Sequence, residues 1–147
     1  NPSRDSLHDL ILRLKDNYSE LLSSLGISFK SKNLETLKDV KLPMDVKQNL
    51  YLIFKEAINN SIKHSNCKQI MLESNLRNDV LEISLTDDGS GFDETIHSKG
   101  NGLKNMEKRA AQIKGRIKIK SSVNSGTSIR FIGKPGTTNK FKSLLKK

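Results

Sequence analysis

Asp87-Asp88-Gly89-Ser90-Gly91-Phe92 follows a run of alternating apolar residues, and this stretch decides how the rest of the chain is understood. The alternation over residues 80–86 predicts a strand that ends at Asp87, because every second side chain lies on one face. A carboxylate there can accept a hydrogen bond from the exocyclic amino group of a nucleobase. Gly89 and Gly91 remove side chains where the backbone passes close to a ligand or takes a positive φ. Taken alone, the motif is more often an ordinary acidic turn.

A polar stripe precedes this motif on a predicted helix. Apolar residues at helical spacing between Pro43 and His64 predict the helix, and Glu56, Asn60 and Lys63 fall within about 60° of one another on it. Asparagine offers the neutral oxygen that Mg²⁺ accepts beside phosphate oxygens and water, and lysine offers a point charge for phosphate. Glu56, within a turn of such an ion, could orient or deprotonate a nucleophile. Without its neighbours, the stripe would be a solvated helix face.

Two glycine motifs follow the acidic one. Gly100-Asn101-Gly102-Leu103 lies directly before a predicted helix that ends at Gly115. Its backbone amides and the helix N-terminus favour a polyphosphate. Gly126-Thr127 lies in the turn of a predicted hairpin that joins strands at residues 116–123 and 127–132. Each motif alone is a common loop or turn, so the prediction of a site depends on their combination and order.

The remaining elements complete a fold prediction. Residues 1–25 predict a helix ended by Gly26, residues 27–30 a short strand, and residues 69–75 and 80–86 a hairpin. The order predicts an α+β fold, a two-layer sandwich with helices packed on one face of a mixed, mostly antiparallel sheet. We expect one domain over residues 1–134, with a lead-in over 1–44 and the motifs over 45–134. Residues 135–147 are expected to form a basic, disordered tail.

The net charge of +10 is concentrated in the last third of the chain. Residues 1–40 hold six basic and six acidic residues, and residues 41–102 hold seven basic and nine acidic ones. Residues 103–147 hold thirteen basic residues and one acidic residue. This excess could attract a nucleotide, an acidic protein or another polyanion. Nucleic-acid binding is disfavoured, because the chain has no Trp and only five Phe and two Tyr for base stacking.

The number of cysteines and the hydropathy of the chain limit the cellular environments in which it could function. Cys67 is the single cysteine, which excludes an internal disulfide and a multi-cysteine metal site. We interpret it as a small packing residue without a chemical role. No run of 18 apolar residues occurs, so we expect a cytoplasmic segment without membrane contact. The chain begins at Asn1 and not at Met, and so it could be a piece of a longer protein whose membrane segment lies elsewhere.

Together the motifs resemble the Bergerat-type nucleotide site of the GHKL superfamily, over residues 45 to 133. The run 56–65, Glu-Ala-Ile-Asn-Asn-Ser-Ile-Lys-His-Ser, resembles the asparagine motif of the nitrate-sensor and lipid-fluidity-sensor branch of sensor histidine kinases. The resemblance implies a Bergerat-type ATP-binding fold and the cofactors ATP and Mg²⁺. It implies the following roles: Asn60 binds Mg²⁺, Glu56 assists transfer, Lys63 and His64 touch phosphate, Asp87 binds the adenine amino group beside Gly89 and Gly91, Gly100, Gly102 and Leu103 close over the phosphates, and Thr127 supports the adenine end.

The segment 102–110 also resembles that branch, which follows its lid with Gly-Leu-x-Asn-Met and an Arg-Ala pair. Only eight residues separate Gly91 from Gly100, which agrees with a short ATP lid. The resemblance implies a phosphoacceptor histidine on a dimerisation domain and a response regulator downstream. His8-Asp9 resembles an acceptor pair, but the 48 positions between His8 and Glu56 leave no room for two long hairpin helices. We therefore interpret His8 as an exposed helix residue and expect the acceptor domain to be absent from this chain.

Two other functions compete with the histidine kinase. An anti-sigma-factor serine kinase is a stand-alone domain of similar length, and an acceptor-helix pair upstream of Asn1 in the parent protein would argue against it. A non-enzymatic ATP-binding or protein-docking module is the second. Gyrase-type and mismatch-repair ATPases and chaperones of the superfamily usually need longer lids and a transducer domain, and neither fits here.

Overall fold

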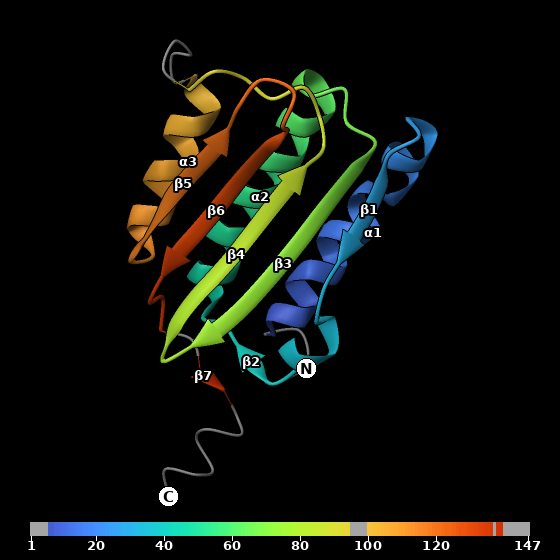
Figure 1. Ribbon diagram of the computed structural model, residues 1–147. Coiled ribbons are helices and arrows are strands. Elements are labelled where there is room, and N and C mark those ends of the chain that lie inside the picture. The colour runs from blue at the N-terminus through green and yellow to red at the C-terminus, as the bar shows by residue number, and fades with distance from the viewer. Residues whose placement is uncertain (1–5, 95–99, 137, 140–147) are drawn as a thin grey trace, which may run out of the picture.

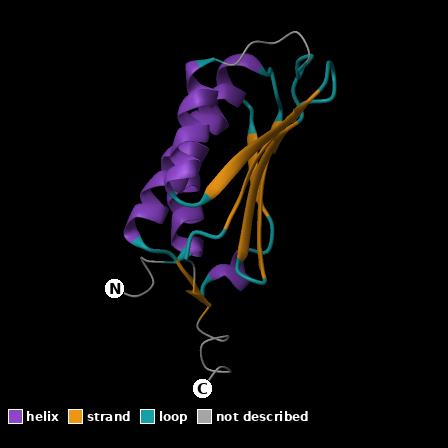
Figure 2. Cartoon of the chain, turned by 90° about the vertical axis from the view of Figure 1, so that its left-hand side faces the viewer, coloured by secondary structure: helices purple, strands orange, loops and turns teal. Residues whose placement is uncertain are grey.

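A computed structural model describes residues 6–94, 100–136 and 138–139 of the chain. Two layers make up the fold, with the helices on one side and the main sheet on the other (Figure 2). In chain order the elements are α1 (Leu7–Ser24), β1 (Ser28–Ser31), η2 (Leu34–Leu37), β2 (Val40–Lys41), α2 (Met44–His64), β3 (Gln69–Arg77), β4 (Val80–Asp87), α3 (Asn101–Gln112), β5 (Gly115–Ser121), β6 (Thr127–Gly133) and β7 (Thr138–Asn139).

The main sheet has five strands in the order β1-β3-β4-β6-β5 (Figure 1). Only the β1–β3 pair is parallel; the other three pairs are antiparallel, so the sheet is mixed and mostly antiparallel. Apolar side chains at alternate positions of the strands face the helices and form one core with them. The predicted fold class, an α+β sandwich with helices on one face of such a sheet, is confirmed.

Helix α1 ends before Gly26 as predicted, but it begins at Leu7 and not at residue 1, and residues 1–5 lie outside the described part. Ser6 is its N-cap, and the Ser6 hydroxyl accepts a hydrogen bond from the amide of Asp9 at 3.0 Å. The helix ends before Gly26, whose φ of +71° is the left-handed conformation that terminates helices. Two leucines that share the helical apolar spacing do not join the core: Leu21 and Leu25 are 47% and 51% exposed, whereas Leu22 beside them is buried.

The turns explain where the structure departs from the predicted element bounds. Asn78 and Asp79 both have positive φ, which gives the two-residue hairpin turn predicted between β3 and β4. The prediction that α3 ends at Gly115 was wrong: α3 ends at Gln112, and Lys114 takes the left-handed conformation with φ of +61°. Gly115 instead begins β5, where a Cβ atom would overlap the ring of Phe131.

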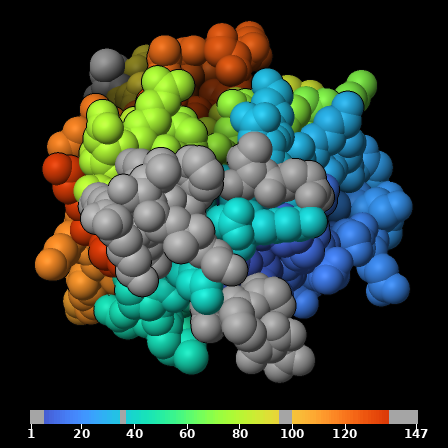
Figure 3. All heavy atoms as spheres, turned by 90° about the horizontal axis from the view of Figure 1, so that it is seen from below, coloured from blue at the N-terminus to red at the C-terminus, as the bar shows by residue number. Residues whose placement is uncertain are grey.

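A second, two-stranded sheet lies at the end of the molecule near the start of α2. Strand β2 pairs antiparallel with β7, with Val40 opposite Asn139 and Lys41 opposite Thr138. Thr138 and Asn139, which fall in the segment 135–147 predicted to be a disordered tail, form β7; residue 137 and residues 140–147 lie outside the described part, so the prediction of a tail is otherwise not tested. Figure 3 looks at this end, where cyan atoms of the chain before α2 lie beside the blue atoms of α1, and α1 contacts both η2 and β2.

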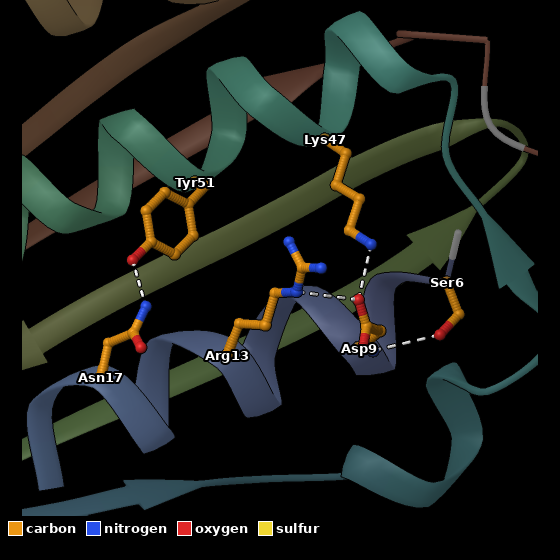
Figure 4. A network of polar contacts seen from close by, with 6 residues as sticks. All are labelled: Ser6, Asp9, Arg13, Asn17, Lys47 and Tyr51. Atoms are coloured by element: carbon orange, nitrogen blue, oxygen red, sulfur yellow. Dashed lines mark hydrogen bonds and ion pairs between the residues drawn. The ribbon is translucent and has the colours of Figure 1, made fainter. Parts of the chain in front are cut away.

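An ion pair joins the first two helices. The ammonium group of Lys47 donates to Oδ2 of Asp9 at 2.5 Å, and Nε of Arg13 lies 3.4 Å from the same oxygen (Figure 4). The Asn17 amide donates to the Tyr51 hydroxyl one turn further along. Lys47 is only 9% exposed, so this charge depends on the Asp9 carboxylate for its solvation.

Candidate functional site

A cavity of about 530 Å³ lies where α2 ends, β4 ends and α3 begins, at the upper end of Figure 1. All the site residues predicted from the sequence line it except Gly89. Its walls are Glu56, Ala57, Asn60, Ser61, Lys63, His64, Ser65, Asp87, Gly91, Phe92, Gly100, Asn101, Gly102, Leu103, Met106, Ile119, Thr127 and Ile129. The fold therefore brings into one hollow the four motifs that the sequence separates, and the roles assigned to these residues stay predictions.

Asp87 is the buried charge of this cavity. Its side chain is 5% exposed at the end of β4. The Ser61 hydroxyl donates to Oδ2 at 2.8 Å, and the Gly89 amide donates to Oδ1 at 2.9 Å. Each carboxylate oxygen has a second lone pair, so the group keeps acceptor capacity toward the cavity. A buried acceptor of fixed orientation is suited to an amino group of a ligand.

Sequence reasoning missed Ser61 and Ser65, the hydroxyl residues behind Asp87. Both are 5% exposed, and the Ser65 hydroxyl donates to the carbonyl of Ser61 at 2.6 Å while accepting from the amide of Cys67 at 3.2 Å. Ser61 lies on the buried side of α2, where a hydroxyl needs a partner. That buried position was the available signal, because a polar residue among core positions requires a hydrogen bond from another element.

Gly89 and Gly91 act through backbone packing. A Cβ atom at Gly89 would overlap the Ser65 backbone, and the next amide, of Ser90, donates to the Ser65 carbonyl at 2.7 Å. Gly91 has a φ of +62°, and a Cβ atom there would overlap the carbonyl oxygen of Ser122. Gly89 therefore seats the loop on the end of α2 without lining the cavity, whereas Gly91 lines the cavity and packs against the turn between β5 and β6.

Gly102 and Glu56 are in close contact across the cavity mouth. A Cβ atom at Gly102 would overlap Oε1 of Glu56, whereas one at Gly100 would meet no atom within 4 Å. Gly102 lies in the first turn of α3 and Glu56 on α2, so the absence of a side chain lets the two helices approach there. A side chain would therefore be in steric conflict at Gly102 but not at Gly100.

Asn60, Lys63 and His64 lie on the last two turns of α2, with Asn60 half-buried and the other two exposed. The stripe predicted from helical spacing faces the cavity at these positions. Within the described residues no cluster of three His, Cys, Asp or Glu could hold a metal. Mg²⁺ does not need such a cage, because it keeps several waters and binds through one or two protein ligands plus phosphate oxygens. The single amide oxygen of Asn60 fits that mode.

Thr127 faces Asp87 across two paired strands. It is the register partner of Asp87 on β4 and of Ser121 on β5. Directly opposite residues in a sheet point to the same side, so the three side chains share the helix-facing side. Thr127 therefore stands beside the acidic group, as the predicted role at the adenine end requires.

The apolar walls of the cavity were also missed by sequence reasoning. Met106 of α3 and Ile129 of β6 are 1% and 5% exposed, and Ile119 is half-buried on β5. They form a flat apolar surface of the kind that lines small-molecule sites. Their periodicity in the sequence predicts that they are core residues. The same periodicity cannot distinguish a residue that packs against a ligand from one that packs against another side chain.

The basic excess on the strands does not serve this cavity. Ile119 lines it, so the neighbouring Lys118 and Lys120 point to the opposite face of the sheet, where both are exposed. The suggestion that these cations attract a nucleotide is not supported by their positions. Among the described residues, Lys63 and His64 are the basic side chains that line the cavity.

The pKa of Asp88 is lowered, first because the amide of Gln69 donates to its carboxylate, with the amide of Lys68 adding to the effect. Asp88 thereby fastens the end of β4 to the start of β3. The pKa of the Cys67 thiol is raised, first by burial, so the thiol is kept protonated. Cys67 is 7% exposed and takes no part in lining the cavity, in agreement with a packing role.

His8 and the second hollow lie away from this site. His8 is partly buried in the first turn of α1, so the prediction of an exposed residue was too simple. A larger, open hollow of about 1050 Å³ lies among α1, α2 and α3, and its walls include Arg13, Lys47 and Arg109. It contains none of the predicted site residues, so the smaller cavity is the candidate site on chemical grounds.

The fold matches solved structures of histidine kinases. The catalytic domain of histidine kinase ThkA superposes with a TM-score of 0.71 at 17% identity, covering 88% of this chain and 94% of that one. The histidine kinase domain of the blue-light activated kinase EL346 of Erythrobacter litoralis superposes with a TM-score of 0.69 at 15% identity, covering 86% and 61%. The architecture is thus that of a histidine kinase catalytic domain.

Sequence comparison narrows this class. Residues 45–136 match the family described as histidine kinase-, DNA gyrase B-, and HSP90-like ATPase. The sensor protein VraS of Staphylococcus aureus is 34% identical over 130 residues, which cover 84% of this chain and 37% of that protein. VraS of Staphylococcus epidermidis is 31% identical over 117 residues, with 79% and 34% covered. The chain belongs to the histidine kinase-, DNA gyrase B-, and HSP90-like ATPase family, and it spans about a third of the length of these curated relatives.

Proposed function

We propose that the chain is the ATP-binding catalytic domain of a two-component sensor histidine kinase. It would present the γ-phosphate of Mg-ATP to a histidine on a dimerisation domain outside this chain. Family membership supports ATP as the ligand, and the likeness to sensor proteins supports the kinase. The short-lid branch stays a prediction, since residues 95–99 are outside the described part.

The buried carboxylate of Asp87 is the observation that carries the proposal. It is held by Ser61 and Gly89 and borders a cavity of about 530 Å³, a size within the range of small-molecule sites. A pocket that uses a buried carboxylate as acceptor favours a ligand amino group over a ligand carbonyl. A carbonyl has no proton to donate, so the carboxylate and the carbonyl would both be left without a hydrogen bond. Adenine presents such an amino group and guanine presents a carbonyl in its place.

Phosphate and metal would occupy the other end of the cavity. Asn60 would hold Mg²⁺ through its amide oxygen, and the ion would neutralise charge on the phosphates and help to orient them. Lys63 and His64 would contribute positive charge and hydrogen-bond donors to the same phosphates. Glu56 reaches the mouth of the cavity beside Gly102, where it could orient the attacking imidazole or accept its proton.

Most of the catalysis would then come from positioning and charge neutralisation, as is usual for phosphoryl transfer. We propose a cytoplasmic location and a response regulator as the downstream partner. No helix in the described residues is long and apolar enough to cross a membrane.

The test has a binding arm and a transfer arm. In the binding arm, a non-hydrolysable Mg-ATP analogue is titrated against the wild type, Asp87→Asn and Asn60→Ala. We expect at least a roughly tenfold loss of affinity for each variant, since each removes a charged or metal-binding contact. Asn105→Ala is the control, because Asn105 is an exposed asparagine of α3 outside the cavity. Full affinity in Asp87→Asn would contradict the adenine assignment.

In the transfer arm, a phosphoacceptor domain is supplied with ATP. Glu56→Gln is expected to bind the analogue with wild-type affinity and to transfer phosphate at least about 100-fold more slowly, the usual scale of general acid–base assistance. Acid-labile phosphohistidine on the acceptor supports the histidine kinase. Acid-stable phosphoserine on a protein substrate would support the serine kinase instead, and ATP binding without transfer to either would support a non-enzymatic module.

A further inference from the structure

Ser121 is a buried hydroxyl residue that none of the proposed roles explains. It is the last residue of β5 and is 8% exposed. It lies beside the cavity and is not part of its lining. Most buried hydroxyl groups have hydrogen-bond partners, and those of Ser121 come from two separate segments of the chain.

Three interactions meet at the Ser121 oxygen. It accepts a hydrogen bond from the amide of Phe92 at 2.9 Å, and it donates to the carbonyl of Gly126 at 3.0 Å. It also lies 2.8 Å from the hydroxyl oxygen of Thr127. Phe92 and Thr127 both line the cavity, so one hydroxyl group links two of its walls.

The number of protons fixes the direction of the Thr127 hydroxyl. A serine hydroxyl has one proton and two lone pairs. We assign the Ser121 proton to the Gly126 carbonyl, which can only accept, and with this assignment the Thr127 hydroxyl donates to Ser121. The lone pairs of the Thr127 oxygen are then left as acceptors next to Asp87, its register partner. Both polar groups at this end of the cavity therefore accept hydrogen bonds and neither donates one to a ligand.

Residues 90–92 are seated on the same hairpin turn by further backbone contacts. The Asn124 amide donates to the Ser90 carbonyl at 2.6 Å. Gly91 has its α-carbon so close to the carbonyl of Ser122 that a side chain would overlap it. Ser121 supplies the side-chain component of this seat, because its hydroxyl holds the following amide, that of Phe92.

We propose that Ser121 is a positioning residue of the nucleotide site and a determinant of its preference for a 6-amino purine. It holds the Phe92 backbone at the cavity wall, and it turns the Thr127 hydroxyl so that this group accepts from the purine. The second part rests on the proposed function; the first does not need a nucleotide.

Amide hydrogen exchange tests the first part. In Ser121→Ala the exchange of the Phe92 amide is expected to rise at least about tenfold over the wild type, because its acceptor is removed. Ser74→Ala is the matched control: Ser74 is also a buried serine of the sheet, 6% exposed, and its hydroxyl has no hydrogen-bond partner in the described structure. Ser74→Ala is expected to leave Phe92 unchanged, and unchanged exchange in Ser121→Ala would refute the positioning role.

Nucleotide preference tests the second part. ATP is compared with inosine triphosphate, which has a 6-carbonyl in place of the amino group. We expect the ratio of the two dissociation constants to fall about five- to tenfold in Ser121→Ala, the scale of one hydrogen bond. Ser121→Thr, which keeps the hydroxyl, is expected to restore the ratio. If Ser121 had only a structural role, Ser121→Ala would weaken the binding of both nucleotides equally. An unchanged ratio of the two dissociation constants would therefore overturn the proposal.

Thr127→Val keeps the test decisive if Ser121→Ala does not fold. This isosteric variant removes the acceptor and leaves the Phe92 amide bonded to Ser121. It is expected to lower the ATP preference without raising exchange at Phe92, and an unchanged ratio would refute the specificity role. If the wild type binds neither nucleotide, the proposed function fails, while the exchange of the Phe92 amide still decides the positioning role.

Discussion

The Ser61 hydroxyl donates a hydrogen bond of 2.8 Å to Oδ2 of Asp87, joining the buried side of α2 to the end of β4. Ser61→Ala removes one of the two donors that hold this carboxylate. We expect the free energy of unfolding to fall by about 1–3 kcal/mol, the cost of leaving a buried polar group with fewer partners. Denaturant unfolding with and without an ATP analogue would measure this cost and any accompanying loss of affinity.

Ser65→Ala provides a comparison for that variant. Its hydroxyl hydrogen-bonds to the backbone and does not reach Asp87. It should lower stability by a similar amount while leaving ATP affinity closer to that of the wild type. Equal losses of affinity in the two serine variants would show that the Ser61 contact has no special effect on the carboxylate.

Gly102→Ala is expected to impair transfer more than stability. A Cβ atom there would displace the Glu56 carboxylate, whereas alanine raises helix propensity by up to about 1 kcal/mol. We predict a thermal midpoint at or above the wild-type value, together with a transfer rate at least about tenfold lower. Gly100→Ala, whose new atom meets nothing within 4 Å, should keep the wild-type rate. Identical rates for both alanine variants would contradict the contact.

The acid stability of the domain should depend on Asp88. Backbone amides of Gln69 and Lys68 lower its folded-state pKa below the usual value of 3.8. The stabilisation is therefore fully present above the unfolded pKa and is lost as pH falls through the folded one. Urea midpoints measured from pH 6 to pH 2 should fall less steeply at the acid end in Asp88→Asn than in the wild type. Parallel curves for the two proteins would refute this contribution.

The pair of Lys47 and Asp9 should stabilise the helical layer without affecting the site. Among the described residues, Lys47→Ala leaves the Asp9 carboxylate with the Arg13 contact alone, and we expect the free energy of unfolding to fall by about 2–4 kcal/mol. The ATP affinity of the folded variant should be unchanged, because the pair lies near the start of α2 and the cavity near its end. A double-mutant cycle with Asp9→Ala would give the coupling energy of the pair. A coupling energy near zero would refute the prediction that the pair stabilises the helical layer.

The sequence predicted those parts of the site that depend on local periodicity. Helical spacing aligned Glu56, Asn60 and Lys63, and strand alternation placed Asp87 at a strand end. Bringing these residues together required the sheet order, and the resemblance to known nucleotide sites supplied that expectation. In the structure these residues line one cavity, and the roles assigned to them stay predictions.

The residues that were missed have partners far away in the chain. Ser61 bonds to a carboxylate 26 positions later, and Ser121 to an amide 29 positions earlier. The pattern of residues within one helix or strand cannot indicate a hydrogen bond to a residue so far away in the sequence. The β2–β7 pairing escaped prediction for the same reason, since Val40 and Asn139 lie far apart in the sequence.

The β2–β7 ribbon has a mechanical consequence. Ser6 forms a β-bridge with Lys41, so the first and last described segments are fastened at one corner, next to the start of α2. Helix α2 has 21 residues and is therefore about 31 Å long, with the cavity at its far end. Turning the domain as a rigid body by 10° about this corner would shift the cavity mouth by roughly 5 Å, over a lever arm of that length. A small rotation about this corner would thus become a larger displacement at the cavity.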